Sequence, residues 1–226
     1  VPAASWTAAE TLKLIALTFD DGPRRSTTTA LLDGLAERGV HATFFLIGAQ
    51  VEDNRDVVRR MDREGHQIGI HTFDHVQLTG LNRADFDAQV EKTRQVLTET
   101  LDHNDFLLRP PYGILDDSVK AWAGCPIILW SIDPEDWLCR DADTVVKRIQ
   151  AEKSLDGQVI LLHSIYDSTV EATRTLVPWL LEQGYQLVTV SELIENRFAD
   201  QVEPNRVYNY DYFRTQLPPL PKETEP

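Results

Sequence analysis

The stretch that decides the fold is Leu14-Ile15-Ala16-Leu17-Thr18-Phe19-Asp20-Asp21-Gly22-Pro23. Its first half is apolar on both faces of an extended chain, which is typical of a strand buried in a parallel sheet. Two adjacent carboxylates follow, and like charges at the exit of a buried strand repel unless a cation lies between them. The stretch therefore predicts a strand that delivers Asp20 and Asp21 to a site, one as a metal ligand and the other as a base. An ordinary turn built from Asp, Gly and Pro is the alternative interpretation.

Six further short apolar segments are expected to be strands, at residues 42–46, 67–70, 106–108, 127–131, 158–162 and 186–190. The segments between them place apolar residues three and four apart, as amphipathic helices do, and several end at a glycine. Strands that alternate with helices predict parallel strands joined by right-handed crossovers. We therefore expect an α/β fold, a distorted (β/α) barrel with about seven parallel strands that is similar to a TIM barrel. A doubly wound open sheet is the alternative.

The composition limits the classes of partner. The chain has 226 residues, enough for one barrel or two small domains. Its 22 basic and 36 acidic residues give a net charge of −14, which disfavours a nucleic acid because polyanion binding needs clustered cations. No stretch approaches the ~18 consecutive apolar residues of a membrane span. The first residues also lack the basic flank and apolar core of a signal segment, so none is expected within the chain.

Three parts are expected along the chain: an N-terminal extension at 1–13, a main domain at 14–197 and a Pro- and Tyr-rich tail at 198–226. The tail is expected to pack back on the main domain through its aromatic residues Tyr208, Tyr210, Tyr212 and Phe213. Cys125 and Cys139 are too few for a disulfide framework or a zinc quartet, so we expect two thiols, with a single bridge as the alternative.

Reactive side chains follow five of the expected strands, in the segments 18–23, 71–75, 109–113 and 133–137 and at His163. The ends of parallel strands in α/β folds share one face, and that face holds the functional site. The side chains in these segments are therefore expected to lie together.

His71 and His75 have the spacing of a chelating pair. Two histidines and one Asp leave an open coordination position, the pattern of a catalytic rather than a structural zinc. Non-haem iron uses a similar set, so this pattern does not choose between the two metals. Surface or core histidines are the alternative interpretation.

Arg109, placed before two prolines, is expected to clamp a carboxylate. Asp136 is expected to orient a neighbouring histidine, and Trp137 to line a substrate pocket. His163 ends a buried strand and is a candidate general acid. Each of these residues also has a purely structural interpretation. Arg109 could be a surface charge and Asp136 a surface acid, while Trp137 could be a packed core ring and His163 a histidine at the edge of the core.

These five motifs, in this order, resemble the polysaccharide deacetylase family, the carbohydrate esterases with a NodB-homology domain. The resemblance covers about residues 14–197, which would make that part the catalytic domain, and leaves the tail outside. It implies a metal-dependent removal of acetyl groups from sugars on a barrel that often has seven strands. The metal implied is Zn²⁺, with Co²⁺ or another divalent transition metal as alternatives.

The resemblance also implies a role for each site residue. Asp21, His71 and His75 would bind the metal, Asp20 would be the catalytic base and His163 the catalytic acid. Arg109 would steady Asp20, and Asp136 would tune His163. Tyr112 would offer its backbone N–H to the oxyanion, and Trp137 and Leu161 would form the pocket for the acetyl methyl. Apart from the resemblance, Trp137, Tyr112 and Tyr166 are candidate stacking surfaces for sugar, with ordinary packing at the barrel edge as the alternative and as the expectation for Tyr166.

The expected substrate is an acetylated glycan. The leading hypothesis is an N-deacetylase that acts on N-acetylglucosamine in peptidoglycan or chitin-type oligomers. The alternative is an acetylxylan esterase. A non-catalytic sugar-binding domain is disfavoured because the five residues expected to act as base, acid and ligands are all present. The family usually acts outside the cytoplasm, so an extracellular or cell-wall location is expected. One complete set of motifs in one chain is compatible with a monomer.

Overall fold

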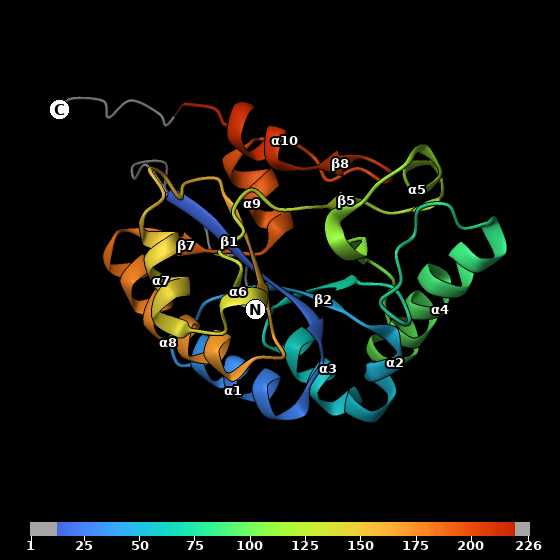
Figure 1. Ribbon diagram of the computed structural model, residues 1–226, viewed down its shortest axis with the longest axis horizontal. Coiled ribbons are helices and arrows are strands. Elements are labelled where there is room, and N and C mark those ends of the chain that lie inside the picture. Colours follow the sequence, from blue (N-terminus) through green and yellow to red (C-terminus); the bar gives the residue numbers. More distant parts are fainter. Residues whose placement is uncertain (1–12, 220–226) are drawn as a thin grey trace.

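Strand β1 (Lys13–Gly22) has neighbours on both sides in a parallel sheet (Figure 1). The structure is a computed structural model and describes residues 13–219. β1 pairs in parallel with β2 (Thr43–Leu46), β6 (Val159–His163) and β7 (Tyr185–Leu187). The strand continues beyond the expected segment, so that Asp20 lies within it, opposite His163 of β6. Two of the reactive residues are thus set side by side by strand register.

The rest of the sheet consists of β3 (Gln67–Ile70), β4 (Leu107–Leu108), β5 (Ile127–Ile128) and β8 (Val207–Tyr208). All pairs are parallel, in the order β6-β1-β2-β3-β4-β5-β8, and β7 pairs with β1. A bridge between Ile132 and Ile160 joins the segment after β5 to β6, where the N–H of Leu161 donates to the carbonyl of Ile132 at 2.9 Å. The sheet therefore curls back on itself. This confirms the predicted distorted (β/α) barrel and excludes the alternative of a doubly wound open sheet.

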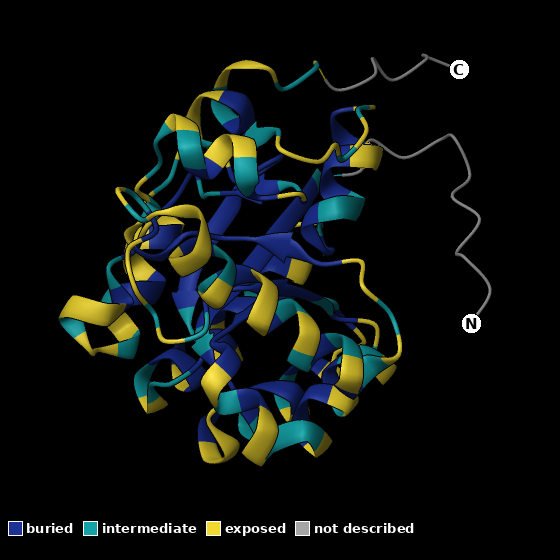
Figure 2. Ribbon diagram, turned by 90° about the vertical axis from the view of Figure 1, so that its right-hand side faces the viewer, coloured by how far each residue is buried: buried dark blue, intermediate teal, exposed yellow. Residues whose placement is uncertain are grey.

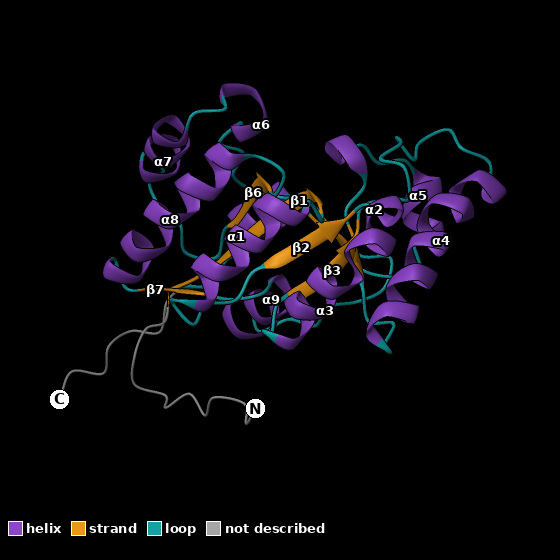
Figure 3. Cartoon of the chain, turned by 90° about the horizontal axis from the view of Figure 1, so that it is seen from below, coloured by secondary structure: helices purple, strands orange, loops and turns teal. Residues whose placement is uncertain are grey.

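Helices surround the curled sheet (Figure 3). Their outer faces are exposed, and the strands and inner faces are buried (Figure 2), as the helical spacing of apolar residues predicts. The helices are α1 (Arg25–Ala36), α2 (Gly48–Val51), α3 (Arg55–Arg63), α4 (Arg83–Leu101), α5 (Asp117–Trp122), α6 (Asp136–Cys139), α7 (Ala142–Gln150), α8 (Asp167–Glu182), α9 (Val190–Arg197) and α10 (Tyr210–Thr215), with 3₁₀ turns η1 (Glu52–Asn54) and η2 (Pro111–Gly113).

The C-terminal segment contributes to the fold. β8 extends the sheet beside β5, and it was not expected. Tyr208, Tyr212 and Phe213 are buried in one apolar cluster with residues of β1, as the packing prediction requires. Tyr210 does not follow that prediction, because its side chain is 56% exposed at the start of α10. The predicted N-terminal extension lies outside the described residues except for Lys13.

Cys125 and Cys139 are free thiols, which confirms the expectation of two thiols over the alternative of a single bridge. Within residues 13–219 the structure contains no helix with the length and apolar character needed to cross a bilayer.

A buried ion pair lies at the end of the barrel opposite the strand exits. Asp156, just before β6, accepts from Arg197 of α9 at 2.7–3.0 Å and from the N–H of Leu14 at 3.1 Å. Arg197→Met is expected to lower the free energy of unfolding by about 3–5 kcal/mol, because it leaves an uncompensated buried carboxylate. Urea unfolding measures the loss.

The exposed pair of Arg25 and Asp56 offers the matched control for this prediction. Arg25→Met is expected to lower the free energy of unfolding far less than Arg197→Met, because water already screens both charges. Equal losses in the two variants would contradict the stabilising role of the buried pair.

Candidate active site

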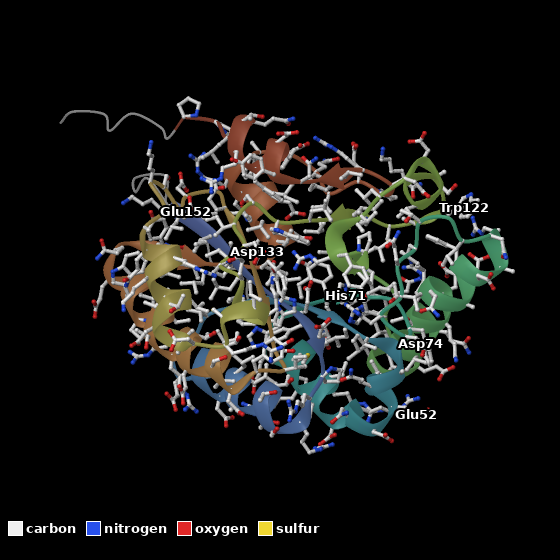
Figure 4. The ribbon with its side chains drawn as sticks, viewed as in Figure 1. Glu52, His71, Asp74, Trp122, Asp133 and Glu152 are labelled. Carbon is white, nitrogen blue, oxygen red and sulfur yellow. The ribbon has the colours of Figure 1, made fainter. Side chains whose placement is uncertain are left out.

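The five reactive segments meet at the carboxyl ends of the strands. They surround a cavity of about 390 Å³ lined by Asp21, His71, His75, Tyr112, Trp130, Asp133, Trp137, Leu161, His163 and Tyr166. Figure 4 places His71 and Asp133 near the middle of the molecule, whereas Glu52 and Trp122 lie at its periphery. The prediction that strand ends from distant parts of the chain form one site is confirmed.

Asp21, His71 and His75 form a group that can hold a metal ion. The Asp21 Oδ1 atom lies 3.4 Å from Nε2 of His71 and 3.2 Å from Nε2 of His75. One ligand atom from each residue lies within 4.8 Å of the other two. Asp21 Oδ1 is buried and accepts no hydrogen bond from any described residue, a costly state for a carboxylate oxygen without a cation. Two imidazole nitrogens and this oxygen fit a divalent transition metal.

The surroundings of these three residues favour metal binding. Nδ1 of His71 donates to the carbonyl of Arg109 at 2.7 Å, which leaves Nε2 with its lone pair directed at the group. Burial, with His71 nearby, lowers the pKa of His75 and favours its neutral form. Burial raises the pKa of Asp21, but the neighbouring imidazoles, His71 foremost, more than offset this and leave its pKa below the ordinary value. The geometry therefore presents the Nε2 lone pair of His71 and the Asp21 carboxylate to a cation.

Arg109 holds Asp20 in one orientation. Both side chains are buried, and Nη1 of Arg109 donates to Asp20 Oδ1 at 2.7 Å. The other guanidinium N–H groups donate to Thr18 Oγ1 and to the carbonyls of Ile128 and Leu129 at 2.8–3.1 Å. Asp20 Oδ2 lies 3.6 Å from Nε2 of His71. One oxygen of Asp20 is therefore fixed by Arg109, and the other faces the metal group.

His163 forms a second pair with Asp136. Nδ1 of His163 donates to Asp136 Oδ1 at 2.8 Å, which leaves Nε2 for the cavity. Asp136 is fully buried, and its Oδ2 accepts from the His163 N–H at 2.8 Å and from the Thr169 hydroxyl at 2.6 Å. Burial lowers the pKa of His163, but the Asp136 carboxylate outweighs burial and raises it above the ordinary value. His163 is thus held as a proton donor.

Tyrosine and tryptophan rings and one leucine supply the apolar part of the cavity wall. Leu161 is buried in this wall, while the side chains of Trp137 and Tyr112 are 44% and 63% exposed. Tyr112 has a φ of 63°, and Asp21, Thr72, His75 and Glu135 also take positive φ in the site loops. Such strained conformations persist where the surrounding contacts determine the backbone, and they gather at functional sites.

Comparison with known proteins identifies the group to which this site belongs. A family model described as polysaccharide deacetylase matches residues 8–124. The chain belongs to the polysaccharide deacetylase family. The peptidoglycan-N-acetylglucosamine deacetylase PgdA of Listeria monocytogenes is 42% identical over 185 residues, 82% of this chain and 40% of the relative.

Two further relatives extend the comparison. The peptidoglycan-N-acetylmuramic acid deacetylase PdaC of Bacillus subtilis is 39% identical over 81% of this chain and 39% of the relative, and a structure of PdaC matches with a TM-score of 0.79 over 81% of this chain and 91% of the solved chain. The structure of a family 4 acetyl xylan esterase from Clostridium thermocellum in complex with a cobalt ion matches with a TM-score of 0.81 at 28% sequence identity. The match covers 87% of this chain and 98% of the solved chain. The chain spans about two fifths of the length of PgdA and PdaC.

In this member of the polysaccharide deacetylase family, several residues to which the sequence assigned no catalytic or binding role also contact the site. Trp130 and Tyr166 line the cavity, which is the position that a sugar-stacking role for Tyr166 requires. Thr18 and Thr169 bind Arg109 and Asp136. Thr18 and Trp130 lie close to expected site residues along the chain, whereas Thr169 is in the first turn of α8 and carries no sequence signal.

Proposed function

We propose that the chain is a metal-dependent deacetylase that removes the N-acetyl group of N-acetylglucosamine residues in peptidoglycan or chitin-type oligomers. The observation that carries the proposal is the pairing of Asp20 with Arg109 and of His163 with Asp136 around the group of Asp21, His71 and His75. A fixed base and a fixed acid beside a metal group are the parts that metal-assisted amide hydrolysis needs.

The metal group contributes the activation of water. A divalent cation held by Asp21, His71 and His75 would lower the pKa of a water molecule toward about 7 and polarise the acetyl carbonyl. We propose Zn²⁺, because two imidazoles and one carboxylate with an open position suit catalytic zinc. Co²⁺ and other divalent transition metals share much of this preference.

Asp20 and His163 move the protons. Oδ2 of Asp20, which Arg109 does not bind, accepts a proton from the attacking water. Arg109 continues to donate its hydrogen bond to Oδ1. Nε2 of His163 donates a proton to the leaving nitrogen as the C–N bond breaks. Asp136 continues to accept the hydrogen bond from Nδ1 of the same ring. The products are acetate and a free amine. The pairing of each group with a buried partner keeps the two roles separate.

The remaining residues place the acetyl group. Leu161 and Trp137 offer an apolar surface for its methyl, and the backbone N–H of Tyr112 is the proposed donor to the oxyanion. The exposed rings of Trp137 and Tyr112 are proposed to contact the sugar. Since one chain supplies every residue of the site, we propose a monomer that acts in the extracellular space or at the cell wall.

Asp136→Asn is expected to move the alkaline limb of the kcat/KM profile to lower pH. A general acid must be protonated, so the rate falls as the pH rises through the pKa of His163. The Asp136 carboxylate raises that pKa, and its removal lowers it. The pH profile of acetate release measures the shift.

The matched control for this pH shift is Asp143→Asn, which removes an exposed carboxylate from α7. Its alkaline limb is expected to stay in place. An unshifted limb in Asp136→Asn would show that His163 does not carry the titrating proton.

Acetylxylan esterase activity is the second candidate, favoured by the likeness to the Clostridium thermocellum acetyl xylan esterase. Acetate release from an N-acetylglucosamine oligomer, peptidoglycan and acetylated xylan separates the two. We expect a higher kcat/KM on the N-acetylated substrates, and the reverse order would favour the esterase.

A further inference from the structure

The loop between His71 and His75 is held by a side chain from another helix. Gln89 lies in α4, and its Oε1 accepts from the N–H of Phe73 at 3.0 Å and of Asp74 at 2.9 Å. Its Nε2 donates to Asp74 Oδ2 at 3.0 Å. Figure 4 shows Asp74 outward from His71, on the side where Figure 1 places α2 and α4. One amide therefore satisfies both backbone donors in the middle of the loop.

The rest of the loop backbone is bonded to α2. The carbonyls of Thr72 and Phe73 accept from the N–H groups of Gly48 and Ala49 at 2.9 and 3.0 Å. The Lys92 ammonium, one helical turn beyond Gln89, lies 3.5 Å from the centroid of the Phe73 ring. α2 thus holds the carbonyl side of the loop, and α4 holds its N–H side and its aromatic side chain.

The two histidines depend on this loop to different degrees. The His71 N–H donates to Leu46 of β2 at 2.9 Å, and its ring donates to Arg109, so its position is set by the barrel. His75 lies beyond the strand at a φ of 58°, and its Nδ1 has only a long contact of 3.5 Å with the Tyr112 hydroxyl. The position of His75 relative to Asp21 therefore depends on the loop backbone.

We propose that Gln89 is a positioning residue that sets the geometry of the metal group by fixing the backbone between its two histidines. The inference rests on the proposed metal site and adds a residue that touches neither metal nor substrate. Without the Gln89 amide, two N–H groups lose their acceptor, and the loop samples conformations in which His75 Nε2 is displaced from Asp21. Metal binding must then restore the order that Gln89 supplies.

The test is the zinc affinity of the metal-free chain, measured by competition with a chromophoric chelator. Gln89→Ala is expected to weaken zinc binding by about 10–100-fold, the range for residues that orient metal ligands. Gln95→Ala is the matched control, since Gln95 lies in the same helix and its side chain donates to Glu99 on the exposed face of α4, away from the loop. That variant is expected to bind zinc as the wild type does.

A reversal of the polar pair sharpens the test. Gln89→Glu keeps an acceptor for the two N–H groups but sets a carboxylate against Asp74, and is expected to weaken zinc binding. Adding Asp74→Asn restores a donor–acceptor pair with its direction reversed, and is expected to recover most of the affinity. This comparison still decides the question if Gln89→Ala fails to fold.

Two results would overturn the inference: wild-type affinity in Gln89→Ala, or an affinity in the double variant no better than in Gln89→Glu. A wild-type chain that binds no zinc or cobalt is a different outcome. It would overturn the metal site itself, and with it the proposed function.

Discussion

Asp20→Asn is expected to lower the rate of acetate release by ~10²–10⁴-fold, the range for a positioned acid–base group. The amide cannot accept the proton that Oδ2 of Asp20 takes from water. Metal binding is expected to persist, because Asp21, His71 and His75 are unchanged. The measurement is the single-substrate rate with saturating zinc, together with the zinc affinity of the variant.

The Asp20→Asn substitution is also expected to lower the stability of the fold, so the assay needs a control for folding. Arg109 is fully buried, and Asp20 is its one carboxylate partner among residues 13–219, so the substitution leaves an unbalanced guanidinium. The rates are therefore compared at a temperature where circular dichroism shows the variant folded. Asp53→Asn removes an exposed carboxylate and is the control with an expected wild-type rate. A folded, zinc-bound Asp20→Asn variant with near wild-type activity would contradict the assignment of the base.

His163→Ala is expected to reduce amide hydrolysis by ~10²–10⁴-fold and to reduce hydrolysis of an aryl acetate much less. An amine leaves only after its nitrogen is protonated, whereas an aryl oxide leaves without a proton. Nε2 is the proton source in the cavity, because Nδ1 is committed to Asp136 at 2.8 Å. The ratio of the two losses isolates the acid step from any general damage to the site.

The control for this ratio is His103→Ala. His103 pairs with Asp62 outside the cavity, and its removal is expected to leave both rates unchanged. Equal losses on amide and ester in His163→Ala would show that protonation of the leaving group is not the role of His163.

The barrel and the principal site residues were predictable because they follow from local pattern. Each buried strand is an apolar run, and the residues directly after it must appear at the same face of a parallel sheet. Asp20, His71 and His163 could therefore be grouped without knowing their distances. The bond between Arg109 and Asp20 depends on the alignment of β1 with the end of β4, which spacing along the chain does not reveal.

The features that were missed depend on contacts between distant segments. β8 is only Val207–Tyr208, too short for a periodic signal, and it forms because β5 offers a free edge. Gln89 and Thr169 occupy ordinary helical positions, and only the packing of α4 and α8 against the site loops brings them to their partners. For Tyr166 the sequence left both edge packing and sugar stacking open, because nothing in its neighbours marks whether its ring meets the cavity.

The most direct test of the central claim measures acetate released from an N-acetylglucosamine oligomer before chelation, after removal of metal, and after addition of zinc or cobalt. If Asp21, His71 and His75 hold the metal that makes this site a deacetylase, chelation abolishes acetate release and the added ion restores it. Full activity in demonstrably metal-free protein would contradict the account.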